Sequence, residues 1–187
     1  MTKSINIFGV GWPGTRPGHA CLLELSGSII KLQLEISDDT LSGLIDKIAK
    51  FMRDKYEVFP VSGIVGRKSD AELAFLKEHN RQPLAQYIVF SEAPNTETDG
   101  LIKYHFNTVL NAMLPDNKRL YLGPPSIVQS ELMELQLPSN QAHKATDIDY
   151  PAVAALGYGV TCLLLRAGQL KRRRAKTNDR VVNIWTS

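Results

Sequence analysis

Long apolar runs, a leader segment and cysteines are scarce or missing in this sequence, and each of these features argues against one class of protein. The longest apolar stretch, Val160 to Leu165 with an alanine-rich lead-in from Ala152, is shorter than the roughly 20 residues that a membrane span needs. No positively charged leader with an apolar core opens the sequence, so we expect a protein that is not exported. Cys21 and Cys162 both lie in apolar segments without metal-binding spacing, which is typical of a reducing cytosol and not of a disulfide scaffold.

What the composition does contain is ordinary for a soluble globular protein. The chain has 187 residues, 43% of them hydrophobic and 22% charged, which excludes wholesale disorder and allows one well-packed domain with a modest appendage. We expect a main domain over residues 1–170 and a basic tail over residues 171–187. We also expect the protein to be cytoplasmic, and we leave open whether it associates with a nucleoid or is encoded by a virus or phage.

The net charge of +3 is mild, but the basic residues are unevenly placed. A block near the C-terminus has no acid before Asp179 and comprises Arg166, Lys171, Arg172, Arg173, Arg174 and Lys176. Such a block favours a polyanionic partner, most commonly nucleic acid. The alternatives are a solubilising tail or an oligomer contact.

The hydrophobic pattern predicts three strands followed by alternating helices and strands. Apolar runs bounded by turn residues predict strands, and apolar residues at helical spacing predict helices. The expected strands are 5–10, 20–25, 29–36, 87–91, 119–122 and an extended passage or strand over 59–65; the expected helices are 41–52, 69–78, 100–114, 126–135 and 150–169. Residues 180–185 form either a final strand or a partner-docking segment. This order indicates an α/β fold with a mixed sheet and helices on its faces.

Acidic residues stand at the ends of two of these elements. Glu92 ends the apolar run that begins at Tyr87, and a carboxylate there must be solvated, paired or bound to metal. Asp147 and Asp149 stand before the last apolar helix. Together they are hard oxygen ligands of the kind that Mg²⁺ or Mn²⁺ binds. Taken singly, Glu92 could instead pair with an arginine, and either aspartate could cap the helix that follows.

The element order and these acids resemble the ribonuclease H-like superfamily, and more narrowly the RuvC-type Holliday-junction resolvases. The resemblance covers about residues 4–168. Gly9-Val10-Gly11-Trp12-Pro13-Gly14-Thr15 follows the family's first-strand turn, Ile88-Val89-Phe90-Ser91-Glu92 its fourth strand, and Asp147, Asp149 and the alanines from Ala152 its last helix. The sequence departs from the family at the first-strand aspartate, whose place is taken by Gly11 or Trp12. Glu24 is a further candidate ligand, although its strand position favours the other end of the sheet.

The resemblance implies a divalent-metal-dependent endonuclease that acts as a homodimer on branched or structured DNA. Glu92, Asp147 and Asp149 would be the catalytic and metal-binding residues. The basic residues from Lys171 to Lys176 would contact the DNA backbone, together with Trp12 and Arg16 in the first turn. The missing aspartate leaves an alternative open: a catalytically inactive descendant that binds nucleic acid or a protein partner within a larger assembly.

Two further interpretations concern single side chains. Trp12 either stacks on a base or plugs an unused cleft. The four histidines, His19 among them, are scattered without a carboxylate or cysteine at metal-ligand spacing, so we expect surface or helix-face positions for them.

Overall fold

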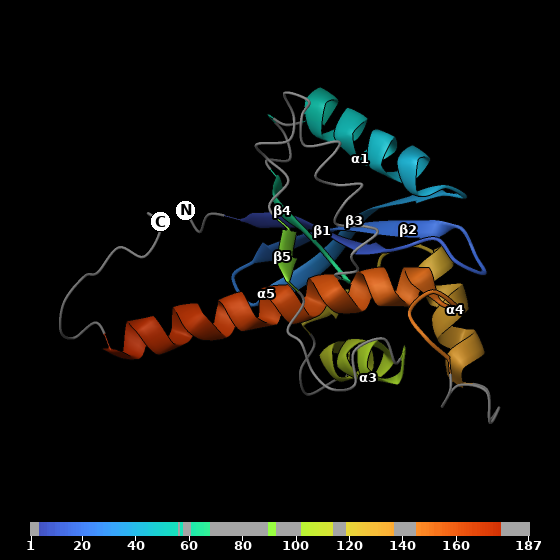
Figure 1. Ribbon diagram of the computed structural model, residues 1–187. Coiled ribbons are helices and arrows are strands. Elements are labelled where there is room, and N and C mark those ends of the chain that lie inside the picture. The colour runs from blue at the N-terminus through green and yellow to red at the C-terminus, as the bar shows by residue number, and fades with distance from the viewer. Residues whose placement is uncertain are drawn as a thin grey trace.

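The computed structural model describes residues 4–55, 57, 61–67, 90–92, 102–113, 119–136 and 145–176 (Figure 1). Within these ranges the elements are, in chain order, β1 (Ile5–Gly11), β2 (Gly18–Ser26), β3 (Ile29–Asp38), α1 (Leu41–Lys55), β4 (Val61–Gly66), β5 (Phe90–Glu92), α3 (Ile102–Met113), β6 (Leu120–Tyr121), α4 (Ile127–Gln136) and α5 (Pro151–Lys176).

The strands form one mixed sheet in the order β5-β4-β1-β2-β3-β6. β1, β2 and β3 are an antiparallel meander, whose second turn contains Gly27 with φ of 65°. β4 lies parallel to β1, β5 parallel to β4, and β6 parallel to β3. An antiparallel meander followed by two parallel strands on the far side of β1 is the ribonuclease H-like arrangement. The predicted fold class is therefore confirmed.

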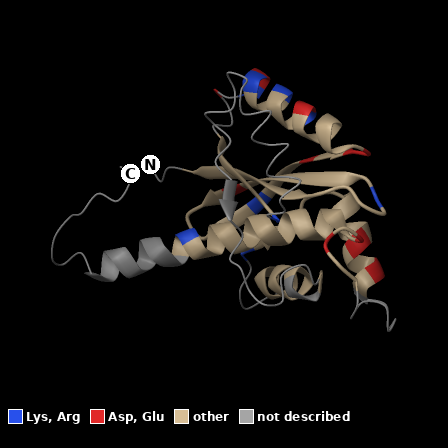
Figure 2. Cartoon of the chain, in the orientation of Figure 1, with Lys and Arg blue, Asp and Glu red and all other residues tan. Residues whose placement is uncertain are grey.

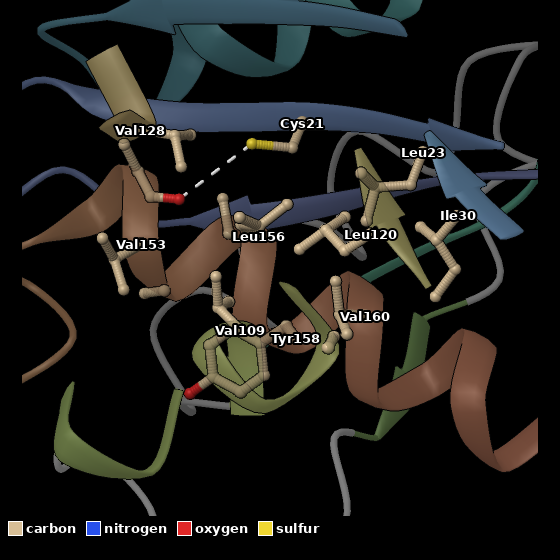
Figure 3. Close-up of a cluster of buried hydrophobic side chains, with 14 of the residues drawn as sticks. Cys21, Leu23, Ile30, Val109, Leu120, Val128, Val153, Leu156, Tyr158 and Val160 are labelled. Atoms are coloured by element: carbon tan, nitrogen blue, oxygen red, sulfur yellow. Dashed lines mark hydrogen bonds between the residues drawn. The ribbon is translucent and has the colours of Figure 1, made fainter. Parts of the chain in front are cut away.

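Helices cover both faces of this sheet (Figure 1). α1 packs on one face, and α5, backed by α3, packs on the other. Side chains alternate along β1 because successive residues of a strand point to opposite faces. Phe8, Val10 and Trp12 therefore belong to the cluster under α1, whereas Ile7 belongs to the cluster under α5. Figure 3 shows the α5 cluster between the strands and that helix.

Local sequence signals explain the element ends. Thr40 caps α1, because its hydroxyl oxygen accepts the backbone N–H of Gly43 at 3.0 Å. Pro151 occupies the first residue of α5, where its missing N–H costs nothing. No charged residue occurs between Pro151 and Leu165, which is why most of α5 can be buried (Figure 2).

Some expectations differ from the structure or fall outside it. α5 continues to Lys176, so the first six residues of the expected basic tail belong to a helix. The expected helix over 69–78 and the segment 180–185 lie outside the described residues. None of the helices in the described ranges is long and apolar enough to cross a membrane.

Candidate metal centre

Three parallel strands end side by side at one edge of the sheet. In the register of the sheet, Val10 of β1 pairs with Gly66 of β4, and Gly66 pairs with Glu92 of β5. Neighbouring strands lie roughly 4.8 Å apart, so Glu92 stands about 10 Å from β1 across this edge. The backbone thus brings the predicted glutamate to the same edge as the first-strand turn. The side chain of Glu92 lies outside the described residues.

Asp147 reaches the same edge through Arg67, the residue that follows β4. Oδ1 of Asp147 accepts a hydrogen bond from Nη1 of Arg67 at 3.0 Å, and Oδ2 accepts one from the hydroxyl of Tyr158 at 3.2 Å. The Asp147 side chain is 4% exposed and that of Arg67 is 42% exposed. Both carboxylate oxygens therefore have donors already, one of them a cation that can turn toward water.

Asp149 closes the turn before α5 and does not cap that helix. One of its oxygens, Oδ2, accepts the backbone N–H of Thr146 at 2.8 Å and the hydroxyl of Thr146 at 2.9 Å. The hydroxyl of Thr15, in the loop after β1, donates to Oδ1 at 3.4 Å. The N–H of Thr146 has the largest effect and lowers the pKa of Asp149 below its ordinary value; burial opposes it, and the hydroxyls of Thr146 and Thr15 lower the pKa further. Asp149 thereby ties the α5 entrance to the first-strand turn.

The cap of α5 comes from Glu131 on α4 instead. Oε2 of Glu131 accepts the backbone N–H of Val153 at 2.9 Å. Burial raises the pKa of Glu131, and the bond from Val153 and the charge of Arg16 oppose this rise. The sequence carried a signal for this role: Glu131 interrupts the buried face that Val128, Leu132 and Leu135 form along α4.

The place of the missing first-strand aspartate is filled by backbone. A Cβ atom added at Gly11 would overlap the carbonyl oxygen of Pro151, because α5 begins directly against the end of β1. Trp12 points to the opposite face, is 3% exposed, and donates its Nε1–H to the carbonyl oxygen of Arg67 at 2.8 Å. In this structure the indole is part of the hydrophobic cluster under α1 and has no open face for a base.

Arg16 lies over the entrance of α5 and not on an open basic surface. Its Nη2 lies 2.6 Å from Oε2 of Glu134, its Nη1 lies 3.9 Å from Oε1 of Glu131, and its guanidinium stacks 4.6 Å above the ring centre of Tyr150. Figure 2 shows acidic residues on α4 beside the start of α5. Any contact of Arg16 with DNA would compete with this pairing.

The remaining predicted site residues are placed by the backbone alone or lie elsewhere. Lys171, Arg172, Arg173, Arg174 and Lys176 occupy the last turns of α5, and their side chains lie outside the described residues. Glu24 pairs with Asn6 near the start of β1 and accepts a hydrogen bond from Gln33 at 2.6 Å. It therefore lies at the opposite end of the strand from Gly11, and the structure excludes it from this site.

Sequence and structure comparisons give a fold and no family. No family model matches the chain, and no curated protein matches it. A large terminase from a thermophilic bacteriophage, solved in complex with ADP, is similar with a TM-score of 0.61 and 16% identity, over 86% of this chain and 40% of that one. A large terminase nuclease from another thermophilic phage, solved with bound zinc, has a TM-score of 0.49 and 18% identity over 82% of this chain and 81% of that one.

The chain thus spans about two fifths of the length of the first terminase. At 16% identity that likeness concerns the fold alone. Taken with the strand order of the sheet, it identifies this chain as a protein of ribonuclease H-like fold.

Proposed function

We propose that the protein is a divalent-metal-dependent endonuclease that acts on branched or structured DNA, in the manner of a junction resolvase. The observation that carries the proposal is the convergence at one sheet edge. β5 ends in Glu92 beside Gly66 of β4, and Arg67, the residue after Gly66, donates a hydrogen bond to Asp147. The backbone position of Glu92 and the Arg67-bound carboxylate of Asp147, about 55 residues apart in sequence, thus both lie toward the edge where the parallel strands end, which is where α/β sheets commonly bind ligands.

The donor chemistry fits a hard divalent cation. Glu92, Asp147 and Asp149 offer carboxylate oxygens, the ligands that Mg²⁺ and Mn²⁺ prefer. Such a metal, when bound, activates water and stabilises the leaving oxygen in phosphodiester hydrolysis. Arg67 would have to leave Oδ1 of Asp147, and its 42% exposed side chain has water to move into. Tyr158 would keep Oδ2 in place meanwhile, since its hydroxyl already donates to that oxygen.

The basic end of α5 supplies the expected DNA contact. The five basic residues between Lys171 and Lys176 lie on helical turns, which would present a dense positive charge to backbone phosphates. Binding through phosphates depends on DNA shape and on salt, with little reading of bases. Symmetric cutting of two strands requires two active sites, so we propose a homodimer. The likeness to a phage terminase supports a phage-encoded protein.

The test is cleavage of a labelled four-way junction in Mg²⁺ or Mn²⁺, with a linear duplex of the same sequence beside it. We expect the junction to be cut and the activity to vanish in Glu92→Gln. Glu24→Gln is the matched control, because Glu24 is a strand acid far from the candidate centre. Equal loss in both variants, or activity that survives Glu92→Gln, would contradict the assignment of Glu92.

A second candidate is the inactive descendant that binds nucleic acid or a protein partner. Two observations favour it: the backbone of Pro151 fills the place of the first-strand acid, and Arg67 neutralises Asp147 without metal. A gel shift with the same junction separates the two candidates. Binding without cutting in either metal supports the descendant, and neither binding nor cutting contradicts both.

A further inference from the structure

Three side chains of metal-ligand type, none of them among the strand-end carboxylates, converge on the α5 face of the sheet. His19 and Cys21 lie two residues apart on β2 and therefore share a face, and Glu35 of β3 is the cross-strand partner of Cys21. Their ligand atoms all lie within 4.8 Å of one another. His19 is thus a buried strand residue with a carboxylate and a cysteine beside it, which corrects the surface or helix-face position predicted for it.

The three side chains are held by their surroundings. His19 is 2% exposed and Cys21 is fully buried. Nε2 of His19 lies 2.9 Å from Oε1 of Glu35, and the same oxygen accepts the backbone N–H of Val128 at 3.1 Å. Sγ of Cys21 faces the carbonyl oxygen of Ala152 at 4.0 Å, a long contact even for sulfur (Figure 3). The thiol is the most weakly bonded member of the cluster.

We propose that His19, Cys21 and Glu35 bind one Zn²⁺ ion, at a site separate from the strand-end carboxylates. Imidazole nitrogen, thiolate sulfur and carboxylate oxygen are the donors that zinc takes in proteins. Neutral histidine, one thiolate and one carboxylate carry two negative charges, which balance a divalent cation in a buried place. Hard ions such as Mg²⁺ would not select a thiolate, so the two sites differ in metal as well as in position.

Binding requires small and balanced changes. Burial, with a smaller effect of the charges of Glu35 and Glu131, raises the pKa of the Cys21 thiol, so the metal-free protein holds a neutral S–H. The zinc–sulfur bond replaces the S–H bond, and one proton is released to the buffer. The His19 to Glu35 hydrogen bond is replaced by bonds from each residue to the ion. The Glu35 side chain is 18% exposed, so the ion can reach the cluster from the solvent beside Glu35.

The site would join three elements of the fold. β2 and β3 carry the ligands, and Glu35 also accepts a hydrogen bond from the backbone N–H of Val128 in the first turn of α4. A bound ion would therefore fix α4, whose Glu131 caps α5, and so stabilise the entrance of the helix that carries the candidate DNA contact. Three protein ligands leave the fourth position of a tetrahedral zinc ion to water. The site does not depend on whether the strand-end acids cut DNA.

Cobalt replaces zinc with the same ligands and reports a thiolate by a charge-transfer absorption band. We expect the metal-free full chain to bind one Co²⁺ with that band, to lose the band when Zn²⁺ is added, and to release about one proton per ion bound. Cys21→Ser should remove the band, and Cys162→Ser should retain it, because Cys162 lies on α5 outside the cluster. Circular dichroism shows whether each variant is folded.

Three results would overturn the proposal: no stoichiometric binding of Co²⁺ or Zn²⁺, a cobalt spectrum without a thiolate band, or equal loss of the band in Cys162→Ser. If Cys21→Ser does not fold, Glu35→Gln serves as the second variant and should weaken Zn²⁺ binding at least tenfold. Glu92→Gln should leave the cobalt spectrum unchanged, so failure of the nuclease assignment and failure of the zinc site are distinguishable.

Discussion

The two faces of the sheet differ in how closely their helices approach it. On the α1 face, β1 presents Phe8, Val10 and Trp12, so large side chains separate helix from strand. On the α5 face the same strand presents Ile7, Gly9 and Gly11, and the helix backbone touches the strand backbone at both glycines. Large side chains of β1 separate helix from strand on the α1 face, whereas glycines of β1 let the two backbones touch on the α5 face.

The close approach of α5 to β1 explains which acidic residues lie at the candidate metal centre and why none of them comes from β1. Because α5 lies so close to β1, the turn that carries Asp147 and Asp149 comes down onto the strand ends, where the two aspartates contact Arg67 and Thr15. The same closeness leaves no room for a side chain at Gly11. The packing that gathers two acids at this edge therefore excludes a third one from β1.

The largest effect is expected on the α1 face. Phe8→Ala removes a fully buried ring that stands edge-on to Phe51, with ring centres 5.7 Å apart. We expect the free energy of unfolding to fall by about 3–5 kcal/mol, measured by urea denaturation. Tyr121→Ala, at a side chain that is 50% exposed, is the control and should change stability by about 0.5 kcal/mol or less. A similar loss in both variants would contradict the volume argument.

Adding a single methyl group on the other face should cost nearly as much. In Gly9→Ala the new Cβ meets the carbonyl oxygen of Ala155, so α5 has to move, and we expect a loss of about 3 kcal/mol. Gly27→Ala is the matched control: its surroundings are open and only its φ of 65° is unfavourable, which costs about 1–2 kcal/mol. If Gly9→Ala costs no more than Gly27→Ala, the backbone contact is not as close as described.

Arg67→Ala tests whether Asp147 only pairs with Arg67 or can also bind a divalent metal ion. The change leaves a buried carboxylate with the Tyr158 hydroxyl as its remaining described donor, and we expect unfolding free energy to fall by about 1–3 kcal/mol. If a divalent ion competes with Arg67, Mn²⁺ should bind the variant more tightly than the wild type in a calorimetric titration. Unchanged or weaker Mn²⁺ binding would favour a structural pair. Arg53→Ala, at a 62% exposed side chain, should change neither quantity.

The sequence was sufficient to predict the mixed sheet and a strand end at Glu92. Apolar runs with turn residues at their ends predict β1, β2 and β3, and the position of Glu92 after such a run predicts a strand end. These signals are local. They do not predict which strands pair in parallel or that the acids converge.

Side-chain partnership could not be predicted in the same way. Arg67 and Asp147 are 80 residues apart, and the sequence around either residue gives no signal that the two side chains pair. Linear spacing does not reveal the cluster of His19 and Cys21, because its third member, Glu35, comes from the neighbouring strand through the register of the sheet. Whether Trp12 faces a ligand or a core depends on strand alternation and on α1, which only the packed sheet decides.

Glu131, the buried acid that caps α5, should make its contribution to the free energy of unfolding decrease as pH rises. The folded-state pKa of Glu131 is raised above 4.5, so folding favours its protonated form. Its contribution is therefore fully present below about pH 4.5 and is lost as pH rises through the higher folded pKa. Glu131→Gln, which can still accept from Val153, should become more stable relative to wild type as pH rises through that range. A flat difference between pH 4 and 7 would contradict the burial effect.

Asp38, whose side chain is 21% exposed, should give a smaller pH dependence of stability, with the opposite sign. Asp38 binds Lys47 at 2.9 Å and accepts the Thr40 N–H at 2.9 Å, and these donors, Lys47 foremost, lower its pKa from 3.8 to about 2. Its contribution is present above pH 3.8 and is lost as pH falls toward 2. Unfolding of wild type and Asp38→Asn, compared at pH 2, 3, 4 and 6, should therefore converge at the acid end. Added salt should shrink the difference at pH 6, because the Lys47 side chain of the pair is 53% exposed. A gap that persists at pH 2 would mean that Asp38 acts through packing and not through charge.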